Sequence, residues 1–130
     1  MDRTISYLRI LFHILTLLLI ILSLYPGSIL GFLLYGDFRL QPQITKDLLY
    51  ISSNHLYVYF LISILGFFSY LRDRKFKLVV IYLFFLSIIL EVAHIIISER
   101  SFQIDDLTGN ILGVLIAYTI ALIYKLWRKQ

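Results

Sequence analysis

The chain contains no cysteine among its 130 residues. This absence excludes disulfide bonds, metal sites built from thiolates, and catalysis by a cysteine nucleophile. It gives no information about the cellular compartment. The candidate functional groups are therefore carboxylates, histidines, arginines and amides.

Charged residues are also scarce. Only 15% of the residues are charged, 60% are hydrophobic, and the mean hydropathy is +0.87. A soluble domain of this size would need far more polar surface, whereas long apolar runs separated by short charged islands are typical of membrane proteins. At roughly 20 residues per span, the chain is long enough for about four spanning helices without a separate soluble domain. We therefore expect residues 1–130 to form a single membrane domain.

The net charge of +4 does not indicate a nucleic-acid partner. The basic residues flank the hydrophobic runs and do not gather on one polar face. In that position they indicate the orientation of the chain in a membrane.

A signal-peptide cleavage site is missing after the first apolar run. Residues 10–25 follow Arg3 and Arg9, as the core of a signal peptide would, but the run ends at Pro26 and Gly27 without small residues for cleavage. We predict a retained anchor helix. The next apolar stretch, residues 28–35, is too short to span and is expected to be interfacial or partly re-entrant.

The remaining runs complete an all-α prediction. We expect an integral membrane four-helix bundle with short loops and without internal repeats. Residues 36–45 are expected to form a solvent-exposed loop. The expected helices are about 8–25, 48–71, 78–97 and 106–127.

Basic residues predict the orientation, because cytoplasmic loops carry the excess of Lys and Arg. Placing both termini and the loop after the second helix inside puts nine basic residues in the cytoplasm and leaves three outside. The nine are Arg3, Arg9, Arg72, Arg74, Lys75, Lys77, Lys125, Arg128 and Lys129, and the three are Arg39, Lys46 and Arg100. We predict that both termini are cytoplasmic.

This orientation brings the unusual polar residues to one depth near the outer face. Ionisable groups within apolar runs are costly in hydrocarbon, so they tend to face a helix bundle and mark a site. Glu91 and His94 share a face of the third helix because they are three residues apart. The candidate ligand-binding residues are His55, Tyr59, Glu91, His94, Arg100, Asp106 and Asn110.

Small residues recur every four positions along the last helix. They are Gly109, Gly113, Ala117 and Ala121. Such a stripe allows close helix packing in lipid. Asp106 and Asn110 fall in the same sector, so we expect the polar residues of this helix to face inward.

Each candidate also has a purely structural interpretation. Glu91 is either protonated through burial or paired with His94 or Arg100. Arg100 is suited to binding a phosphate or carboxylate, or else pairs with Glu99 or Asp105 in its own loop. Asp106 is suited to capping the last helix.

The pattern of Glu91 and His94 resembles half of a di-iron site. Such a site needs more ligands than the sequence clearly supplies through His55 and Asp106. We therefore predict neither a metal nor another cofactor.

The spacing of several of these residues resembles the VanZ-like family. The pattern is a carboxylate, an arginine, an aspartate six positions later, an asparagine four later and a glycine three later, preceded upstream by a histidine and a tyrosine four residues apart. Here these residues are Glu91, Arg100, Asp106, Asn110, Gly113, His55 and Tyr59. The resemblance covers residues 55–130, and the first helix fits by hydropathy alone.

Two positions depart from the family pattern. His94 stands where the family usually has glutamine, which is a further argument against a metal, and Ile51 and Ser52 replace an Asp-Lys pair. The resemblance implies a small multi-pass protein of the cell envelope. The family takes its name from a member linked to glycopeptide (teicoplanin) resistance, and similar proteins accompany polysaccharide assembly. No agreed reaction comes with the family.

Three functions are compatible with these features. The first is an envelope factor that binds a membrane lipid, a lipid-linked saccharide or a polyprenyl phosphate at its outer face. The second is an intramembrane enzyme acting on a lipid-linked substrate, with Glu91 or His94 as acid or base. The third is a structural or assembly subunit that meets a membrane protein partner through its small-residue face.

Overall fold

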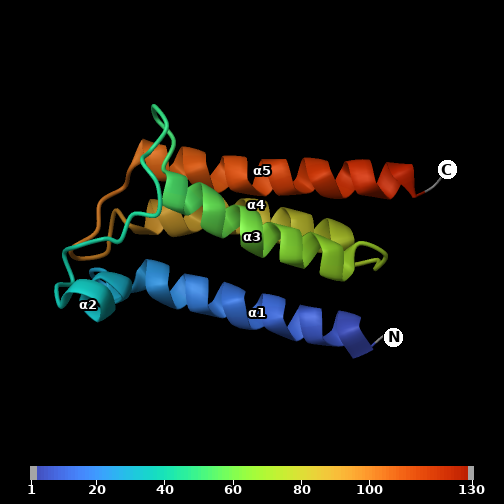
Figure 1. The fold of residues 1–130 in the computed structure, drawn as a ribbon, viewed down its shortest axis with the longest axis horizontal. Helices are drawn as coiled ribbons and strands as arrows, with labels where there is room; N and C mark the ends of the chain where they lie inside the picture. The colour runs from blue at the N-terminus through green and yellow to red at the C-terminus, as the bar shows by residue number, and fades with distance from the viewer. Residues whose placement is uncertain (1–2, 129–130) are drawn as a thin grey trace.

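A computed structural model describes residues 3–128, and these residues are all helical apart from their connections (Figure 1). The all-α prediction is confirmed, and the described residues contain no β-strand. The described residues form five helices, not four, because the short apolar stretch after the first helix is itself helical. The helices are α1 Arg3–Leu24, α2 Ile29–Tyr35, α3 Ser53–Tyr70, α4 Phe76–Ala93 and α5 Ile104–Trp127.

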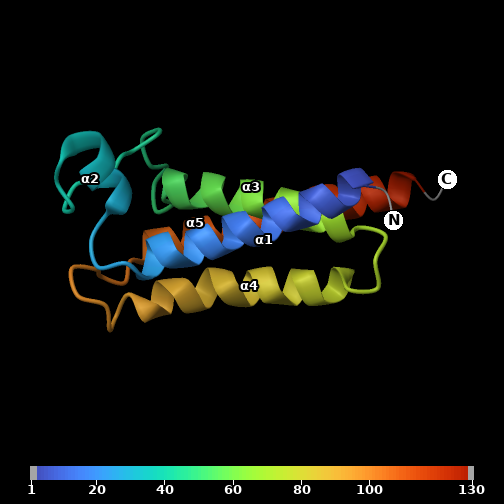
Figure 2. The same ribbon diagram turned by 90° about the horizontal axis from the view of Figure 1, so that it is seen from below.

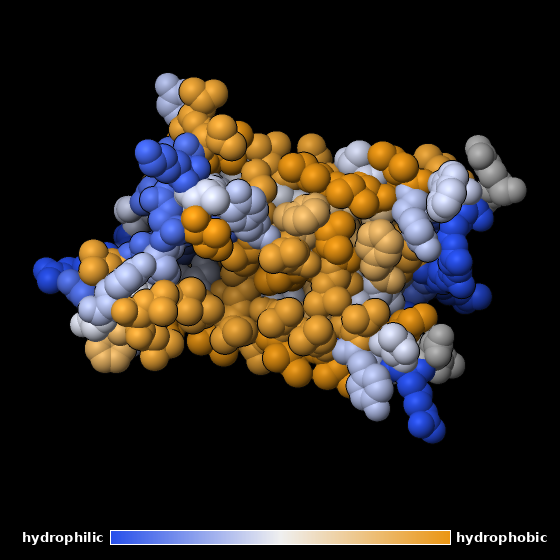
Figure 3. All heavy atoms as spheres, in the orientation of Figure 1, coloured by the Kyte–Doolittle hydropathy of each residue, from blue (hydrophilic) through white to orange (hydrophobic). Residues whose placement is uncertain are grey.

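Three helices within residues 3–128 are long and apolar enough to cross a membrane, namely α1, α4 and α5. The helix α3 is not among them, although we expected four membrane-spanning helices. It begins with Ser53, Asn54 and His55, and it packs against each of the other long helices. Figure 3 shows a continuous apolar band between two hydrophilic ends, as expected of a membrane protein.

The four long helices run lengthwise beside one another (Figures 1 and 2). The helices α3 and α4 lie between α1 on one side and α5 on the other, and both outer helices contact both inner ones. The start of α1, the α3–α4 turn and the end of α5 lie at one end of the molecule. The opposite end carries α2 and the two longer loops.

The closest helix pair is α3 and α5, and the small residues of α5 make it possible. A Cβ atom added at Gly109 would lie 2.5 Å from the carbonyl oxygen of Ser52, and one at Gly113 would lie 2.6 Å from that of Leu56. Ala117 is also fully buried. The stripe therefore lies against the backbone of α3, as small residues in packed helices generally do.

At the end of the molecule where the chain starts, α1 is attached to α3. Phe12 packs on Gly66, where an added Cβ would lie 2.6 Å from its ring. The guanidinium of Arg9 donates to the carbonyl oxygen of Ser69 at 3.1 Å and to a carboxylate oxygen of Asp73 at 2.7 Å. Elsewhere α1 is largely exposed, so these contacts fix its position at this end.

The observed helix boundaries differ from the expected ones by a few residues. The helix α3 begins at Ser53, not near residue 48, because Asp47 turns back to accept the Ser53 backbone N–H at 2.8 Å. The helix α4 ends at Ala93, so His94 occupies its C-cap position and residues 95–97 form turns. The helix α5 begins two residues earlier than expected, at Ile104.

Candidate functional site

A cleft of about 370 Å³ opens between α1 and α3, toward the end that carries α2 and the loops. One face of α1 and one face of α3 form its walls, and these walls are apolar. The wall residues are Leu15, Leu18, Leu19 and Leu22 from α1 and Val58, Leu61 and Ile62 from α3. The cleft is therefore lined by apolar side chains along both helices.

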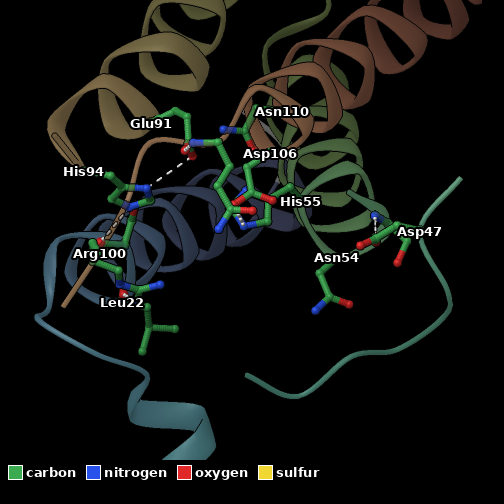
Figure 4. A network of polar contacts seen from close by, with 12 residues as sticks. Leu22, Asp47, Asn54, His55, Glu91, His94, Arg100, Asp106 and Asn110 are labelled. Carbon is green, nitrogen blue, oxygen red and sulfur yellow. Dashed lines mark hydrogen bonds and ion pairs between the residues drawn. The ribbon is translucent and has the colours of Figure 1, made fainter. Parts of the chain in front are cut away.

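The polar end of this cleft gathers the candidate site residues that the sequence singled out (Figure 4). Six of the seven candidates line the cleft: His55, Tyr59, Glu91, His94, Arg100 and Asn110. The seventh, Asp106, places a carboxylate oxygen 3.6 Å from Nε2 of His55. Residues from α3, α4, α5 and the α4–α5 loop thus meet at one level.

Asn110 connects three helices. Its side chain is 1% exposed. The Nδ2 group donates to the carbonyl oxygen of Ser87 in α4 at 3.1 Å, so the other atom, Oδ1, is the acceptor that lies 2.9 Å from Nδ1 of His55 in α3. A carbonyl-type oxygen can only accept, so Nδ1 of His55 carries the hydrogen. The amide therefore fixes the His55 tautomer.

Glu91 is fully buried. Its Oε1 accepts the backbone N–H of Gln103 at 2.9 Å, directly before α5 begins. Its Oε2 lies 3.3 Å from Nδ1 of His94 but has no hydrogen-bond partner among the described residues. On the far side of the same ring, Nε2 of His94 lies 3.1 Å from the carbonyl oxygen of Ser23 in α1. Oε1 of Glu91 thus accepts a backbone N–H, and Oε2 lies at ion-pair distance from the ring of His94.

Arg100 ties the loop between α4 and α5 to the end of α1. Its Nε donates to the carbonyl oxygen of Tyr25 at 3.3 Å and its Nη2 to that of Leu22 at 3.1 Å. Cations at a helix C-terminus satisfy carbonyl groups that have no partner within the helix. Burial lowers the pKa of Arg100 from its usual value, while the carboxylates of Asp106 and Glu91 act in the opposite direction.

The structural interpretations of Arg100 and Asp106 both need correction. Within residues 3–128, the guanidinium of Arg100 donates to carbonyl oxygens at the end of α1 and directly after it, and not to Glu99 or Asp105. Asp106 is not the cap of α5, because the helix starts at Ile104 and Gln103 holds the N-cap position. Asp106 instead lies in the first turn, where a negative charge interacts favourably with the helix dipole.

The site also includes residues that the sequence analysis missed. Ser23, Ser87 and Gln103 provide backbone groups that hold His94, Asn110 and Glu91 in place. Ser23 and Ser87 are isolated polar residues within apolar runs, a signal that was available in the sequence. The hydrogen bond of Gln103 uses its backbone, so its side-chain identity gave no signal.

One set of side chains has the composition of a metal site. Single ligand atoms from His55, Glu91 and Asp106 all lie within 4.8 Å of one another. The sequence analysis considered these three residues together with His94 and predicted no metal; the set found here leaves out His94 and takes one residue from each of α3, α4 and α5.

Comparison with known proteins gives a family but no characterised relative. No curated protein and no solved structure matches the chain. The family model described as VanZ/LLP1 matches residues 11–127, which is nearly the whole sequence. The chain therefore belongs to the VanZ/LLP1 family.

Proposed function

We propose that this protein binds an amphiphilic, anionic ligand, such as a polyprenyl phosphate or a lipid-linked saccharide, in the cleft between α1 and α3. The observation that carries the proposal is the two-part lining of this cleft. Its walls are leucine, isoleucine and valine side chains, and its polar end holds two histidines, a carboxylate, an arginine and an amide. A lipid has the same division into an apolar chain and a polar head.

The attachment of α1 supports a groove that is open to lipid. Polar contacts fix α1 at one end through Arg9 and at the other through Ser23, Leu22 and Tyr25. The leucines between these two attachments remain partly exposed, and several of them line the cleft. A hydrocarbon chain lying there would cover apolar surface that the protein itself leaves uncovered.

The polar end suits a phosphate carrying a hydroxyl-rich group. Arg100 lines the cleft, and a guanidinium is the side chain best matched to phosphate oxygens. Glu91 and Asn110 line the same cleft, and carboxylate and amide oxygens accept hydrogen bonds from sugar hydroxyls. We place the role of such binding in the cell envelope, in polysaccharide or cell-wall processes or in glycopeptide resistance.

The orientation that goes with this proposal has four crossing helices and cytoplasmic termini. Eight of the nine basic residues assigned to the cytoplasm lie in the described part of the chain, and Lys129 lies outside it. The start of α1, the α3–α4 turn and the end of α5, which carry these residues, share one end of the molecule (Figure 1). The polar end of the cleft then faces the outside.

Cysteine labelling tests this orientation cleanly, because the chain has no cysteine of its own. In intact cells, a membrane-impermeant maleimide is expected to label Gln43→Cys, in the exposed loop before α3. The matched variant Arg74→Cys, in the exposed turn after α3, should react only after the cells are permeabilised. The reverse pattern would overturn the orientation and place the cleft on the cytoplasmic side.

Lipid retention tests the binding proposal. We expect native mass spectrometry of the protein in mild detergent to show a discrete phospholipid or polyprenyl-phosphate adduct. Leu18→Trp fills the apolar part of the cleft and should reduce the bound fraction at least about fivefold. Leu18 is 47% exposed, so the larger side chain is not expected to disturb the fold.

A neighbouring substitution provides the control. Leu17 is 58% exposed on the same helix and does not line the cleft, so Leu17→Trp should keep the adduct. Equal retention of lipid by both variants would mean that the lipid binds elsewhere on the surface and not in the cleft. If the folded wild type retains no specific lipid, the proposal fails, and holding the helices together becomes the better account of the polar cluster.

A further inference from the structure

The side chains of His55, Glu91 and Asp106 form a compact cluster at the polar end of the cleft. They come from three different helices, and one ligand atom of each lies within 4.8 Å of the other two (Figure 4). Nε2 of His55 lies 3.6 Å from a carboxylate oxygen of Asp106. Atoms bound to one first-row metal ion at roughly 2.1 Å lie roughly 3 to 3.4 Å apart, so small side-chain rotations would bring the three into coordination.

The tautomer of His55 is the one that a metal site requires. Asn110 holds the hydrogen of His55 on Nδ1, as its own bond to the Ser87 carbonyl shows. With this hydrogen on Nδ1, Nε2 is the ring nitrogen that faces Asp106 and is available to a metal ion. Metal-binding histidines commonly donate their other N–H to a fixed acceptor, which orients the ring toward the ion. Here the Asn110 side chain is that acceptor.

The buried carboxylate provides a second, independent observation. Glu91 is fully buried, and its Oε2 has no hydrogen-bond partner among the described residues. Oε2 lies 3.3 Å from Nδ1 of His94, whose Nε2 lies 3.2 Å from the Ser23 hydroxyl and 3.1 Å from the Ser23 carbonyl oxygen. The guanidinium of Arg100 donates to the carbonyl oxygens of Leu22 and Tyr25. Because a second carboxylate, that of Asp106, lies close to this buried one, a cation between them would lower the cost of burying both charges.

We propose that His55, Glu91 and Asp106 bind one divalent transition-metal ion, Zn²⁺ or Mn²⁺. One imidazole and two carboxylates form a mixed nitrogen and oxygen set, which suits these ions better than Ca²⁺ or Mg²⁺, whose protein ligands are oxygens. Three protein ligands leave coordination positions open. Because His55 and Glu91 line the cleft, an open position faces its polar end. The proposal does not depend on a lipid being bound.

Direct metal binding tests this inference. The full chain in detergent would be stripped with a chelator, loaded with Zn²⁺ or Mn²⁺, desalted, and assayed by elemental analysis, with affinity taken from competition against a chromophoric chelator. About one ion per chain is expected. Asp106→Asn should weaken binding at least about tenfold, whereas Asp105→Asn, which changes the adjacent carboxylate, should leave it unchanged.

Glu91→Gln separates metal binding from folding. Its carbonyl oxygen can still accept the Gln103 N–H, and its amide can donate to Nδ1 of His94. We therefore expect the metal-free variant to melt like the metal-free wild type but to bind metal at least about tenfold more weakly. Equal metal content in the wild type, Asp106→Asn and Glu91→Gln would mean adventitious binding and would overturn the proposal. Absence of binding in the folded wild type would also overturn it. Neither result involves lipid, so lipid retention is judged separately.

Discussion

Replacing Gly113 by leucine is expected to abolish the folded protein. A Cβ atom at this position would lie 2.6 Å from the Leu56 carbonyl oxygen, 2.8 Å from the Phe60 backbone nitrogen and 3.0 Å from Cβ of Tyr59. Two of these are backbone atoms, so α3 as a whole would have to move away from α5. Overpacking of this kind costs about 3 kcal/mol or more, a large share of the stability of a typical domain. Size-exclusion profiles and thermal melting of the detergent-solubilised protein measure the loss.

The control for this substitution lies on the same helix. Thr119 is exposed and donates only to the carbonyl oxygen of Leu115 within α5, so Thr119→Leu should behave like the wild type. Gly113→Ala should be intermediate, because the Cβ alone already meets the backbone of α3. A Gly113→Leu protein that elutes and melts like the wild type would show that α5 does not pack this closely on α3.

The sequence predicted the helical class of this protein because hydropathy is a local property. Runs of apolar residues interrupted by charged islands located four long helices, and each run corresponds to a helix. The exact ends depended on contacts that are not local. The start of α3 is set by Asp47, which accepts the N–H of Ser53, and the start of α5 by Glu91, which accepts the N–H of Gln103 from another helix. Neither contact follows from the residues at the boundary itself.

The central position of α3 was also beyond sequence reasoning. In the structure it contacts all the other long helices, and Phe67 is fully buried. Helix length and composition do not determine which helix becomes central, because this choice follows from how the faces of all the helices fit together.

The candidate site was predicted better than the loops around it. A depth argument along α3, α4 and α5 placed His55, Glu91 and Asn110 at one level, and the structure brings them into one cluster. The contribution of α1 was not expected. Leu22 and Tyr25 act through carbonyl groups, and every residue has one, so nothing in the sequence distinguishes them. Ser23 was the one available signal, as a polar residue within an apolar run.

Replacing Asn110 by leucine is expected to destabilise the protein strongly while preserving side-chain size. Asn110 is almost fully buried and joins α3 and α4 to α5 through His55 and the carbonyl oxygen of Ser87. Leucine would leave the His55 N–H and one lone pair of the Ser87 oxygen without partners. Unsatisfied buried groups cost about 1 to 3 kcal/mol each, so we expect a loss of about 2 to 4 kcal/mol. Thermal melting in detergent measures this loss.

A second asparagine provides the matched control, because it makes a similar number of hydrogen bonds in a less buried setting. Asn54 donates to the Pro42 carbonyl oxygen and accepts the Ile44 N–H, and water can replace both partners at the surface. Asn54→Leu should therefore cost less than about 1 kcal/mol. Asn110→Asp separates the two contacts of Asn110, since it keeps an acceptor for His55 but sets a second oxygen against the Ser87 carbonyl. If Asn110→Leu melts at the same temperature as Asn54→Leu, the buried amide is not what holds the three helices together. The argument for the His55 tautomer would then lose its structural basis.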